Sequence, residues 1–357
     1  MTYIPSQAKP IALIFGGRGF EREISCKSAG RIASTLKELS LPFISVYITA
    51  RGDWLKFPSD PAKIKNASSV DCSEFLYAYP VMLYGRSGFL TEGSVTEVLC
   101  AIPALHGDFG EDGTVQGALE CARIPYLGQG VLAGAVASDK EFTKLLAASV
   151  GIPTLPHEVL REPYTEALGA LALKRAKERF GYPMFIKPSS LGSSGGALGV
   201  NTDEEFHYAL RQASELCSGK VLIEKLIKPD LELEIAYLDG DAKIFTHPSC
   251  VSLSGEAYDF QKKYTAGGAV TSVRADISED IANKAIDYAR RLSELLSLRD
   301  LARIDFFLIG EDIYFNEINT FPGFTEGSLY PEMLSLLGID IGELIKRLVS
   351  LASGRAV

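Results

Sequence analysis

Two acidic residues and an asparagine in one predicted hairpin have the types and the spacing of magnesium ligands. The stretch 303–331 reads RIDFFLIGEDIYFNEINTFPGFTEGSLYP and predicts a strand, a turn and a second strand. Because the side chains of a strand alternate between two faces, a three-residue loop at 310–312 would set Asp305 opposite Glu317, with Asn319 on the same face. Mg²⁺ binds in proteins through one or two carboxylates together with phosphate oxygens. This face is therefore a candidate metal site, and the alternative is an amphipathic hairpin with one solvated face.

The other residues of the hairpin separate into a polar face and an apolar face. Arg303 joins the polar face. The residues predicted to enter the core from the apolar face are Ile304, Phe306, Leu308, Tyr314 and Ile318. The loop that follows contains Gly323, and a glycine lets backbone approach a ligand closely. A glycine directly after the metal candidates favours a site over a plain hairpin.

A segment rich in glycine and serine has the composition of a phosphate-binding loop. Residues 188–196 read PSSLGSSGG and follow Lys187, which ends a predicted strand. Glycines leave backbone N–H groups free to surround phosphate, serine hydroxyls add donors, and a lysine supplies a positive point charge. A hairpin loop without a ligand is the alternative, but the lysine before it and the strand after it favour phosphate. Residues 252–270 are polar and contain two tyrosines and two lysines, which predicts a mobile loop that could close over a site.

The amino-terminal part of the chain predicts an α/β fold of the nucleotide-binding type. Residues 11–15 (IALIF) form a short apolar run typical of a buried parallel strand, and a glycine run and a helix over 21–39 follow. Ligands of such folds lie at the carboxyl ends of the strands. The glycine run at 16–19 lacks the full spacing of a dinucleotide-binding motif, so it is also consistent with a tight turn.

The loop after a second buried strand, at 98–105, places a histidine beside glycines and acidic residues. It begins at His106 and continues GDFGEDGT. A histidine at the carboxyl end of a core strand is a candidate site residue. The alternative is that Asp112 or Thr114 only caps the helix that runs through Ala122. The surroundings of the other three histidines favour structural roles.

Hydrophobic periodicity, glycines and prolines place the elements that must hold these residues. Further strands are predicted over 41–49, 182–187, 220–227, 231–238 and 243–250, and helices over 140–150, 163–180, 202–216, 278–298 and 340–351. Gly181 is expected to follow the end of a helix. The segment 50–93 is too irregular for its elements to be assigned, and a change of composition near 128–130 predicts a domain boundary.

Length, composition and charge limit the class of protein. A chain of 357 residues predicts two or three domains, and 46% hydrophobic with 23% charged residues is typical of a globular protein with a substantial core. The net charge of −9 argues against a nucleic-acid-binding surface, so an anionic small substrate would need a local basic pocket. Six scattered cysteines without a C-x-x-C pair predict a reduced, cytoplasmic protein. The first apolar run is too short for a signal peptide or a membrane-spanning helix.

Several motifs, in order along most of the chain, resemble those of the D-alanine–D-alanine ligases of the ATP-grasp superfamily. The hairpin and its loop match R-x-D…N-E-x-N-T-x-P-G-x-T…S-L-x-P, and residues 106–117 match H-G-x-x-G-E-D-G-T-x-Q-G. D-K at 139–140, K-P at 187–188 and G-S-S-x-G at 192–196 are similar to motifs of the family's central domain. Y-D-F-x-x-K-Y at 258–264 resembles its closing loop.

The first glycine loop departs from the family pattern. The family carries G-G-x-S-x-E there, and this chain reads GGRGFE over 16–21, so Gly19 replaces the usual serine. Glu21 keeps its place, and the resemblance therefore still implies the family's activity.

The resemblance implies a role for each matching residue. ATP is expected to bind between the central and C-terminal domains at Lys140, Lys187, Ser194, Glu224, Lys225, Glu232 and Lys263. Two Mg²⁺ ions, or Mn²⁺, are expected at Asp305, Glu317 and Asn319, with Glu317 bridging. The first D-alanine is expected at Glu21 and His106, and the second at Ser328 and Leu329. Arg303 and Gly323 are expected to face the developing oxyanion, and Ser193 and Tyr264 to form a hydrogen-bonded latch with Glu21.

The resemblance also implies the fold and the reaction. The expected fold is α/β, with an N-terminal doubly wound parallel sheet at 1–128, a central ATP-grasp domain at 129–223 and a C-terminal one at 224–357 that holds the metal site and the closing loop. The expected reaction forms D-alanyl-D-alanine through an acyl phosphate, with release of ADP and phosphate, for peptidoglycan precursor synthesis in the cytoplasm. A homodimer is expected, with neither nucleic acid nor membrane as a partner. The alternatives are a ligase that joins D-alanine to D-serine or D-lactate, and a regulatory protein that binds ATP without turnover.

Overall fold

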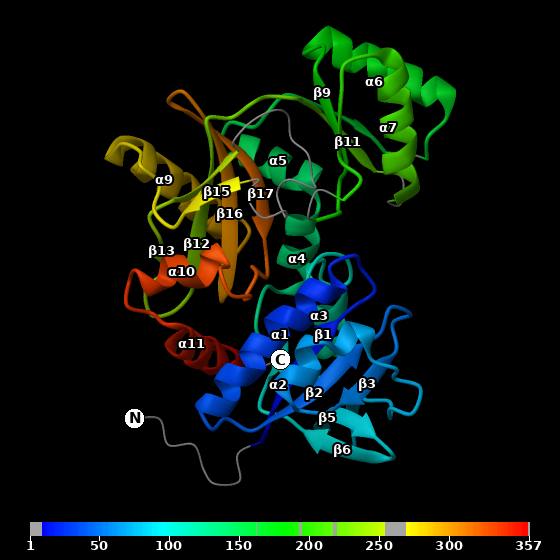
Figure 1. Ribbon diagram of the computed structural model, residues 1–357, viewed down its shortest axis with the longest axis vertical. Helices are drawn as coiled ribbons and strands as arrows, with labels where there is room; N and C mark the ends of the chain where they lie inside the picture. Colours follow the sequence, from blue (N-terminus) through cyan, green and yellow to red (C-terminus); the bar gives the residue numbers. More distant parts are fainter. Residues whose placement is uncertain (1–8, 162, 193–194, 217–219, 254–268, 356–357) are drawn as a thin grey trace.

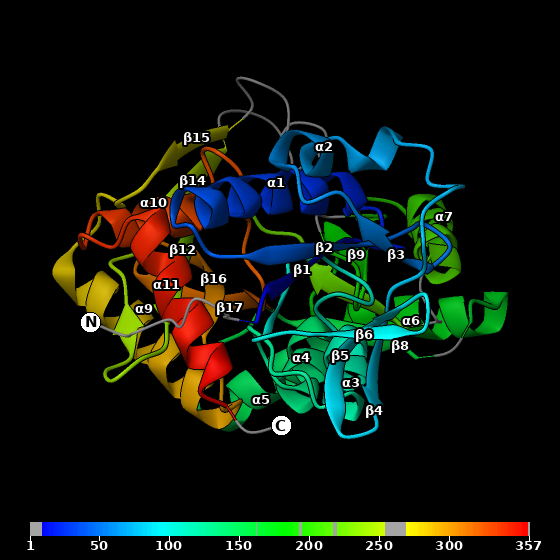
Figure 2. The same cartoon turned by 90° about the horizontal axis from the view of Figure 1, so that it is seen from below.

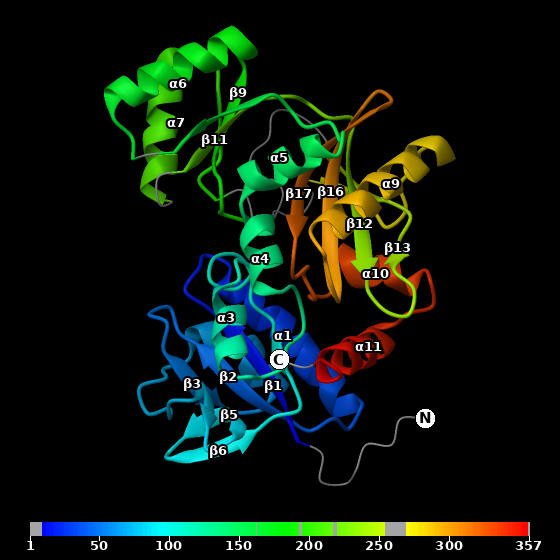
Figure 3. The same cartoon turned by 180° about the vertical axis from the view of Figure 1, so that it is seen from behind.

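The computed structural model describes residues 9–161, 163–192, 195–216, 220–253 and 269–355. In Figure 1 the ribbon separates into an N-terminal lobe below, a central lobe at the upper right and a C-terminal lobe at the upper left, and Figure 3 shows the same lobes from behind. Each lobe is built around a sheet of its own. Among the described helices, none has both the length and the apolar character needed to cross a membrane.

The N-terminal lobe is a sheet with a helix on each face. Its strands are β1 (Ile11–Gly16), β2 (Phe43–Ile48), β3 (Trp54–Phe57) and β7 (Ala101–Pro103), in the order β3-β2-β1-β7. β1 is parallel to β2 and β7, and β3 is an antiparallel edge. Leu13 packs with helix α1 (Arg22–Glu38), and Ile14 packs on the opposite face with helix α3 (Thr114–Cys121). The predicted doubly wound sheet is thus confirmed, and it brings the loops after β1 and β7 to one edge.

The segment left unassigned from the sequence contains short, mostly exposed elements. Besides β3, they are helix α2 (Pro61–Lys65), the 3-10 turn η1 (Ala67–Ser69), and strands β4 (Tyr79–Leu83) and β5 (Arg86–Thr91), and strand β6 (Ser94–Glu97) follows directly after the segment. The last three strands form an antiparallel sheet whose tight turns contain Gly85 and Gly93, with φ of 77° and 78°. Periodicity missed β4 because this strand is exposed or half-buried along its whole length and shows no alternation.

The central lobe is an antiparallel sheet covered by two helices. Its strands are β8 (His157–Leu160), β9 (Met184–Pro188), β10 (Leu198–Val200) and β11 (Val221–Lys225), in the order β10-β9-β11-β8. Helices α6 (Glu166–Arg179) and α7 (Asp203–Leu216) pack on it through a core that includes Ala176, Phe206 and Ile223. Gly181 follows α6 with φ of 61°, the left-handed conformation expected after a helix end.

The C-terminal lobe holds a six-stranded sheet with helices on its apolar face. The strands are β12 (Leu231–Leu238), β13 (Ile244–Phe245), β14 (Ser249–Leu253), β15 (Ala269–Ser272), β16 (Leu301–Ile309) and β17 (Asp312–Asn319). The helices are α4 (Val131–Ser138), α5 (Lys140–Ser149) and α9 (Glu279–Leu295). The sequence did not predict α4, which is separated from α5 only by Asp139. This side chain accepts hydrogen bonds from the N–H groups of Glu141 and Phe142 and so begins a new helix.

Helices α10 (Leu329–Ser335) and α11 (Ile341–Ser353) join the C-terminal lobe to the N-terminal lobe. One apolar cluster contains Ala33 of α1, Leu348 of α11 and Phe324 of the loop after β17, and α11 is seen beside α1 from below in Figure 2. Site residues on the two lobes therefore share a core. The domain boundaries at 128/129 and 223/224 remain a proposal, and β11 runs across the second of them.

Candidate active site

The hairpin of β16 and β17 pairs the predicted metal ligands, but its turn length and its register differ from the prediction. Ile309 pairs with Asp312, so the turn has two residues, not three. A β-bulge then adds one residue to β17, because Phe306 pairs with Phe315 whereas Asp305 pairs with Glu317. The predicted pairing of the two carboxylates is confirmed, and the predicted three-residue loop is wrong.

The same bulge changes which residues of β17 form the apolar face. Tyr314 pairs with Phe307 and does not belong to the core cluster that contains Ile304, Phe306, Leu308 and Ile318. Its place is taken by Phe315, which is fully buried in that cluster. The prediction for Tyr314 is wrong because an extra residue reverses the alternation between the turn and Glu317.

Asp305 is held on the polar face by an arginine and an amide. Arg303 donates to the two carboxylate oxygens of Asp305 over 2.8 and 2.7 Å, and its Nε lies 3.3 Å from Glu234 of β12. Asn319 donates to Asp305 over 2.9 Å. Burial alone would lower the pKa of Arg303, but the facing carboxylates of Asp305 and Glu234 outweigh it and hold that pKa well above its usual range. Arg303 is therefore a fixed positive charge on this face.

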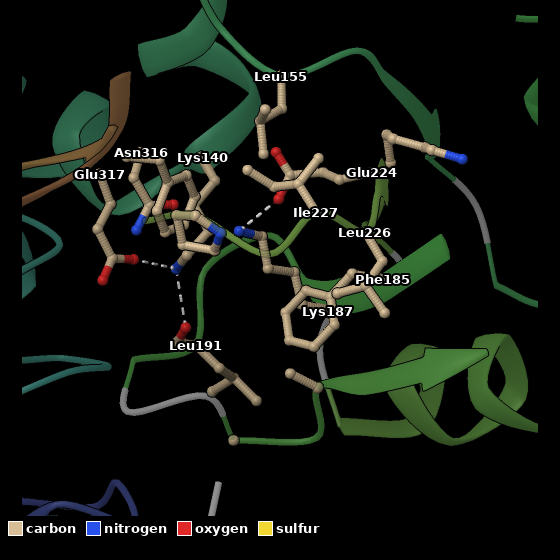
Figure 4. A pocket seen from close by; sticks show the side chains of 15 residues that line it. Lys140, Leu155, Phe185, Lys187, Leu191, Glu224, Leu226, Ile227, Asn316 and Glu317 are labelled. Carbon is tan, nitrogen blue, oxygen red and sulfur yellow. Dashed lines mark hydrogen bonds and ion pairs between the residues drawn. The ribbon is translucent and has the colours of Figure 1, made fainter. Parts of the chain in front are cut away.

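Lys140 connects the hairpin to the glycine- and serine-rich segment. It is the first residue of α5, and its ammonium lies 3.4 Å from Glu317 and donates to the carbonyl of Leu191 over 2.9 Å. Both contacts are drawn in Figure 4. A buried lysine placed between a metal-ligand candidate and a predicted phosphate loop is suited to contact a phosphate group.

A small cavity of about 60 Å³ lies between the central sheet and β17, and Figure 4 shows side chains around it. Its lining combines charged groups with apolar side chains, among them Lys140, Lys187, Glu224, Lys225, Leu155, Phe185, Leu226, Ile227, Phe307 and Glu317. Apolar walls with a few placed polar groups suit a planar base, and lysines suit phosphates.

One described residue predicted to bind ATP does not line this cavity, and two others lie outside the described residues. Glu232 of β12 is buried but is not part of the lining formed by the described residues. Ser194 and Lys263 lie outside the described residues, as does the closing loop from 254 to 268. Their predicted roles stay predictions.

A fully buried lysine that the sequence analysis missed contacts a residue predicted to bind ATP. Lys144 of α5 lies 2.7 Å from one carboxylate oxygen of Glu224, and Lys187 lies 2.6 Å from the other. Burial would raise the pKa of Glu224, but the two ammonium groups lower it to about 2. Burial also lowers the pKa of Lys144, against the pull of Glu224. Its position four residues after Lys140, on the same helix face, is the signal that could have found it.

Lys144→Met is expected to destabilise the fold by about 3–5 kcal/mol, because Glu224 would lose one of its two partners inside the protein. The measurement is the free energy of unfolding in a denaturant titration. Lys174→Met is a matched control, since Lys174 and Glu178 lie 3.9 Å apart with both side chains mostly exposed, and exposed pairs contribute little. Equal losses in the two variants would contradict a structural role for the buried pair.

Glu21 lies where three predicted motifs meet. It directly precedes α1, and its Oε2 lies so close to Gly107 and Gly192 that added Cβ atoms would come within 2.4 and 2.7 Å of it. The first glycine loop, the loop after β7 and the predicted phosphate loop thus converge on one carboxylate. Ser193 and Tyr264, the other predicted members of the latch, lie outside the described residues.

His106 connects the N-terminal lobe to the loop after β17. Its Nδ1 lies 3.1 Å from the carbonyl oxygen of Phe321, and its Nε2 lies 3.1 Å from Ser28 Oγ. Because a carbonyl only accepts, the proton belongs on Nδ1, and Nε2 accepts from Ser28. Burial lowers the pKa of His106 to about 4, so the ring is neutral near pH 7. These contacts give His106 a positioning role, and its predicted contact with the first substrate stays a prediction.

Two more missed residues support the same loop. Arg31 donates to the carbonyl of Thr325 over 2.7 Å. Glu111 accepts from the N–H groups of Gly107 and Phe321 over 2.8 and 2.9 Å. Burial and the neighbouring Glu21 raise the pKa of Glu111 to about 7, although its hydrogen bonds oppose the shift. Glu111 lies inside the predicted motif 106–117, which was the available signal.

Gly323 and Ser328 are brought together as the motif implied. A Cβ at Gly323 would lie 3.1 Å from Ser328 Oγ, and this hydroxyl also lies 2.8 Å from Thr325 Oγ1. Ser328 precedes α10 and Leu329 is its first residue. An open backbone next to a hydroxyl at a helix start can receive a carboxylate, which agrees with the predicted place of the second substrate.

The polar face of the hairpin fits Mg²⁺ by the chemistry of its donors. Asp305, Glu317 and Asn319 supply hard oxygen ligands on one side of two paired strands. Within the described ranges, no three His, Cys, Asp or Glu side chains gather to hold a metal. Two carboxylates and an amide suit an ion that completes its coordination with substrate phosphates and water.

Comparisons with known proteins agree with this geometry along the whole chain. Family models described as D-ala D-ala ligase N-terminus and D-ala D-ala ligase C-terminus match residues 10–129 and 146–350. A D-alanine–D-alanine ligase of Prosthecochloris aestuarii is 36% identical over 356 residues, which cover 96% of this chain and 97% of that protein.

Solved structures show the same likeness in three dimensions. The VanG D-Ala:D-Ser ligase of Enterococcus faecalis is 30% identical, covers 97% of this chain and 100% of its own, and has a TM-score of 0.85. The D-alanyl-alanine synthetase A of Vibrio cholerae is 29% identical, covers 98% and 100%, and has a TM-score of 0.84. These matches confirm the expected fold class, and the chain belongs to the D-alanine–D-alanine ligase family.

Proposed function

We infer that this chain joins two D-alanine molecules at the expense of ATP and releases ADP and phosphate. The observation that supports this most is the polar face of the hairpin, where Arg303, Asp305 and Glu317 lie beside Lys140 at the edge of a lysine-containing cavity. Membership of the ligase family over the whole chain supports D-alanine as the substrate.

The reaction needs an activated carboxylate, because a carboxylate ion is a poor electrophile. Transfer of the γ-phosphoryl group of ATP to the first D-alanine would give an acyl phosphate and ADP. The amine of the second D-alanine would then attack the carbonyl carbon, lose a proton, and expel phosphate as the C–O bond breaks. Lys140 and Lys187 would bind phosphate oxygens, and Arg303 with the backbone N–H of Gly323 would stabilise the developing oxyanion.

Glu21 and Ser328 would hold the ends of the two substrates. The Glu21 carboxylate would bind the ammonium of the first D-alanine, and the contacts of His106 and Glu111 hold the loops around it. The hydroxyl of Ser328 would receive the carboxylate of the second D-alanine. Glu21 lies on the N-terminal lobe and Ser328 on the C-terminal lobe, and the core that the two lobes share fixes the distance between these residues.

Asp305, Glu317 and Asn319 would hold two Mg²⁺ ions, or Mn²⁺. When bound, such ions neutralise phosphate oxygens during phosphoryl transfer. Arg303 and Lys140 lie beside two of these ligands, at 2.7 Å from Asp305 and 3.4 Å from Glu317. We also propose a cytoplasmic homodimer that serves peptidoglycan precursor synthesis, on the support of family membership.

A second candidate is ligation of D-alanine to D-serine. One similar solved structure is a D-Ala:D-Ser ligase, and an apolar pocket rejects an added hydroxyl by only about 10²-fold. Leu329 beside Ser328 favours D-alanine, since it adds an apolar side chain at the predicted acceptor position.

Phosphate release tests both candidates. The enzyme with ATP and Mg²⁺ is given D-alanine, D-serine and D-lactate singly and then in equal mixture, and the products are resolved by mass spectrometry. D-Alanyl-D-alanine is expected to predominate. A predominant alanyl-serine product would reassign the acceptor, and absence of phosphate release with every substrate would leave a nucleotide-binding protein without turnover.

A further inference from the structure

A second cavity lies in the N-terminal lobe, apart from the cavity lined by Lys140 and Lys187. It has a volume of about 260 Å³ and is lined by residues that follow β1, β2 and β7 and by the first turns of α3. In open α/β sheets ligands bind outside the carboxyl ends of the strands, where successive connections leave in opposite directions. Here β1 has β2 on one side and β7 on the other. Pockets for drug-sized ligands span about 300–1,000 Å³, so this cavity suits a smaller molecule.

The lining is apolar inside and positively charged overall. The apolar residues are Ile48, Trp54, Leu105, Val115 and Ala118. The charged residues are two arginines, Arg18 and Arg51, and one aspartate, Asp108, while His106 is neutral. Two positive charges and one negative charge leave a net positive lining in a chain whose net charge is −9. The cavity therefore favours an anion with an apolar part.

Arg18 is an exposed residue that packs against two neighbouring loops at this cavity. A Cβ at Gly52 would lie 3.1 Å from Arg18 Cδ, so the aliphatic part of the arginine packs on the turn after β2. Its guanidinium carbon lies 4.2 Å from the centre of the Phe109 ring. Among the ion pairs of the described residues, none includes Arg18. The guanidinium thus lies between the loops that carry Gly52 and Phe109, and its fork of donors is available to a ligand.

Phe109 is itself held in a strained conformation to support this arginine. Its φ is 64°, a left-handed value that is uncommon for a bulky side chain. The N–H of Phe109 donates to Asp112 over 2.9 Å, which stabilises the turn. Backbone strain of this kind persists where the surroundings enforce it and is frequent at ligand sites. The arginine directly precedes Gly19, the position at which this chain departs from the family pattern.

We propose that this cavity binds a small carboxylic acid with an apolar body, with the carboxylate at Arg18 and the body against Trp54 and Leu105. A planar carboxylate pairs with the two parallel N–H groups of a guanidinium. Arg51 adds a second guanidinium, which lies 3.5 Å from Asp53 and is mostly exposed. The apolar walls exclude water from the remainder of the ligand.

The cavity is distinct from the position proposed for the first D-alanine. Glu21 is not part of its lining. Glu21 instead contacts Gly107, whose two neighbours in the chain, His106 and Asp108, line the cavity. The two sites therefore share a loop and His106, whereas Glu21 belongs only to the first and Arg18 only to the second. The new site does not depend on the proposed ligase reaction.

Binding of 3-phenylpropanoate to the full chain tests the proposal. Trp54 is the single tryptophan of the sequence, so its fluorescence reports on the cavity wall. A saturable change is expected with 3-phenylpropanoate, and binding of the uncharged 3-phenylpropanamide is expected to be weaker by about tenfold or more, because the charged hydrogen bonds are lost. Arg18→Ala is expected to weaken binding of the acid to a similar extent. Arg175→Ala, which removes an exposed arginine of α6, is the matched control and should leave the affinity unchanged.

A second variant and a competition experiment complete the test. Ala118→Phe places a ring in the cavity and is expected to abolish binding without lowering the midpoint of thermal unfolding. Saturating D-alanine is expected to leave the affinity for 3-phenylpropanoate unchanged. Equal binding of the acid and the amide, an unaltered affinity in Arg18→Ala, no binding to the unmodified chain, or displacement of the probe by D-alanine would each overturn the proposal. None of these readouts uses ligase activity, so their failure is distinguishable from failure of the proposed function.

Discussion

Glu317→Gln is expected to lower kcat for phosphate release by about 10²- to 10³-fold, because a bound metal ion contributes several kcal/mol to phosphoryl transfer and each 1.4 kcal/mol is about tenfold in rate. The substitution keeps the size of the side chain and removes its charge. Glu317 faces Asp305 across the hairpin and lies 3.4 Å from the Lys140 ammonium. The variant would therefore lose one of two carboxylates on the proposed metal face and the partner of a lysine proposed to bind phosphate. The measurement is kcat at saturating ATP and D-alanine over a series of Mg²⁺ concentrations.

The control for Glu317 comes from the same hairpin. Asp312 is exposed at the start of β17, so Asp312→Asn removes an equal charge outside the site. Its kcat and its dependence on Mg²⁺ should match those of the unmodified chain. Both variants should unfold at nearly the same temperature, since neither side chain belongs to the core. Normal Mg²⁺-dependent turnover in Glu317→Gln would show that this carboxylate is not a metal ligand.

The second large effect is expected at Arg303. Arg303→Ala should lower kcat by about 10²- to 10³-fold, the scale found when one donor to an oxyanion is removed. The guanidinium is held by Asp305 over 2.8 and 2.7 Å and by Glu234 over 3.3 Å. Its position, and therefore its charge, is preorganised before the substrate binds. The measurement is kcat and KM for ATP and for D-alanine.

Arg303→Lys separates charge from geometry. A lysine keeps the positive charge that Asp305 and Glu234 require but loses the planar fork of donors. Its kcat should fall between those of Arg303→Ala and the unmodified chain. Arg347→Ala, in an exposed pair with Glu343 on α11, should have no effect on kcat. A rise in KM for ATP with unchanged kcat in Arg303→Ala would identify Arg303 as a ground-state phosphate ligand.

The sequence predicted the elements around the site where hydrophobic periodicity is strong. The strand at 11–15, the helices at 202–216 and 278–298 and the two strands of the hairpin all appear close to their predicted bounds. The periodicity failed for the antiparallel sheet β4-β5-β6, in which β4 and β6 are exposed or half-buried, and for α4, whose border with α5 is a capping contact of Asp139. Strands without an alternation of buried and exposed residues give no periodic signal.

Motif spacing also predicted how several candidate site residues lie relative to one another, because these residues are close together in the sequence. Asp305, Glu317 and Asn319 share one hairpin, and Lys187 directly precedes its loop, so their neighbours are set by local geometry. Even there the register depended on the bulge at Asn316, which no alternation rule indicates. The predicted loop length and the placement of Tyr314 were wrong for this single reason.

The sequence by itself determined the residue types of the site, the family, and the strands and helices that carry the motifs. Only the tertiary structure decided which partners these residues meet. His106 meets Phe321 at a distance of 215 positions along the chain, and Glu111 meets the same residue at 210. Lys144 meets Glu224 because α5 packs between two sheets, and Arg18 reaches Gly52 and Phe109 because three loops end at one sheet edge. Such contacts depend on how whole elements pack, and burial then sets the charge of each group, as the neutral His106 and the ionised Glu224 show.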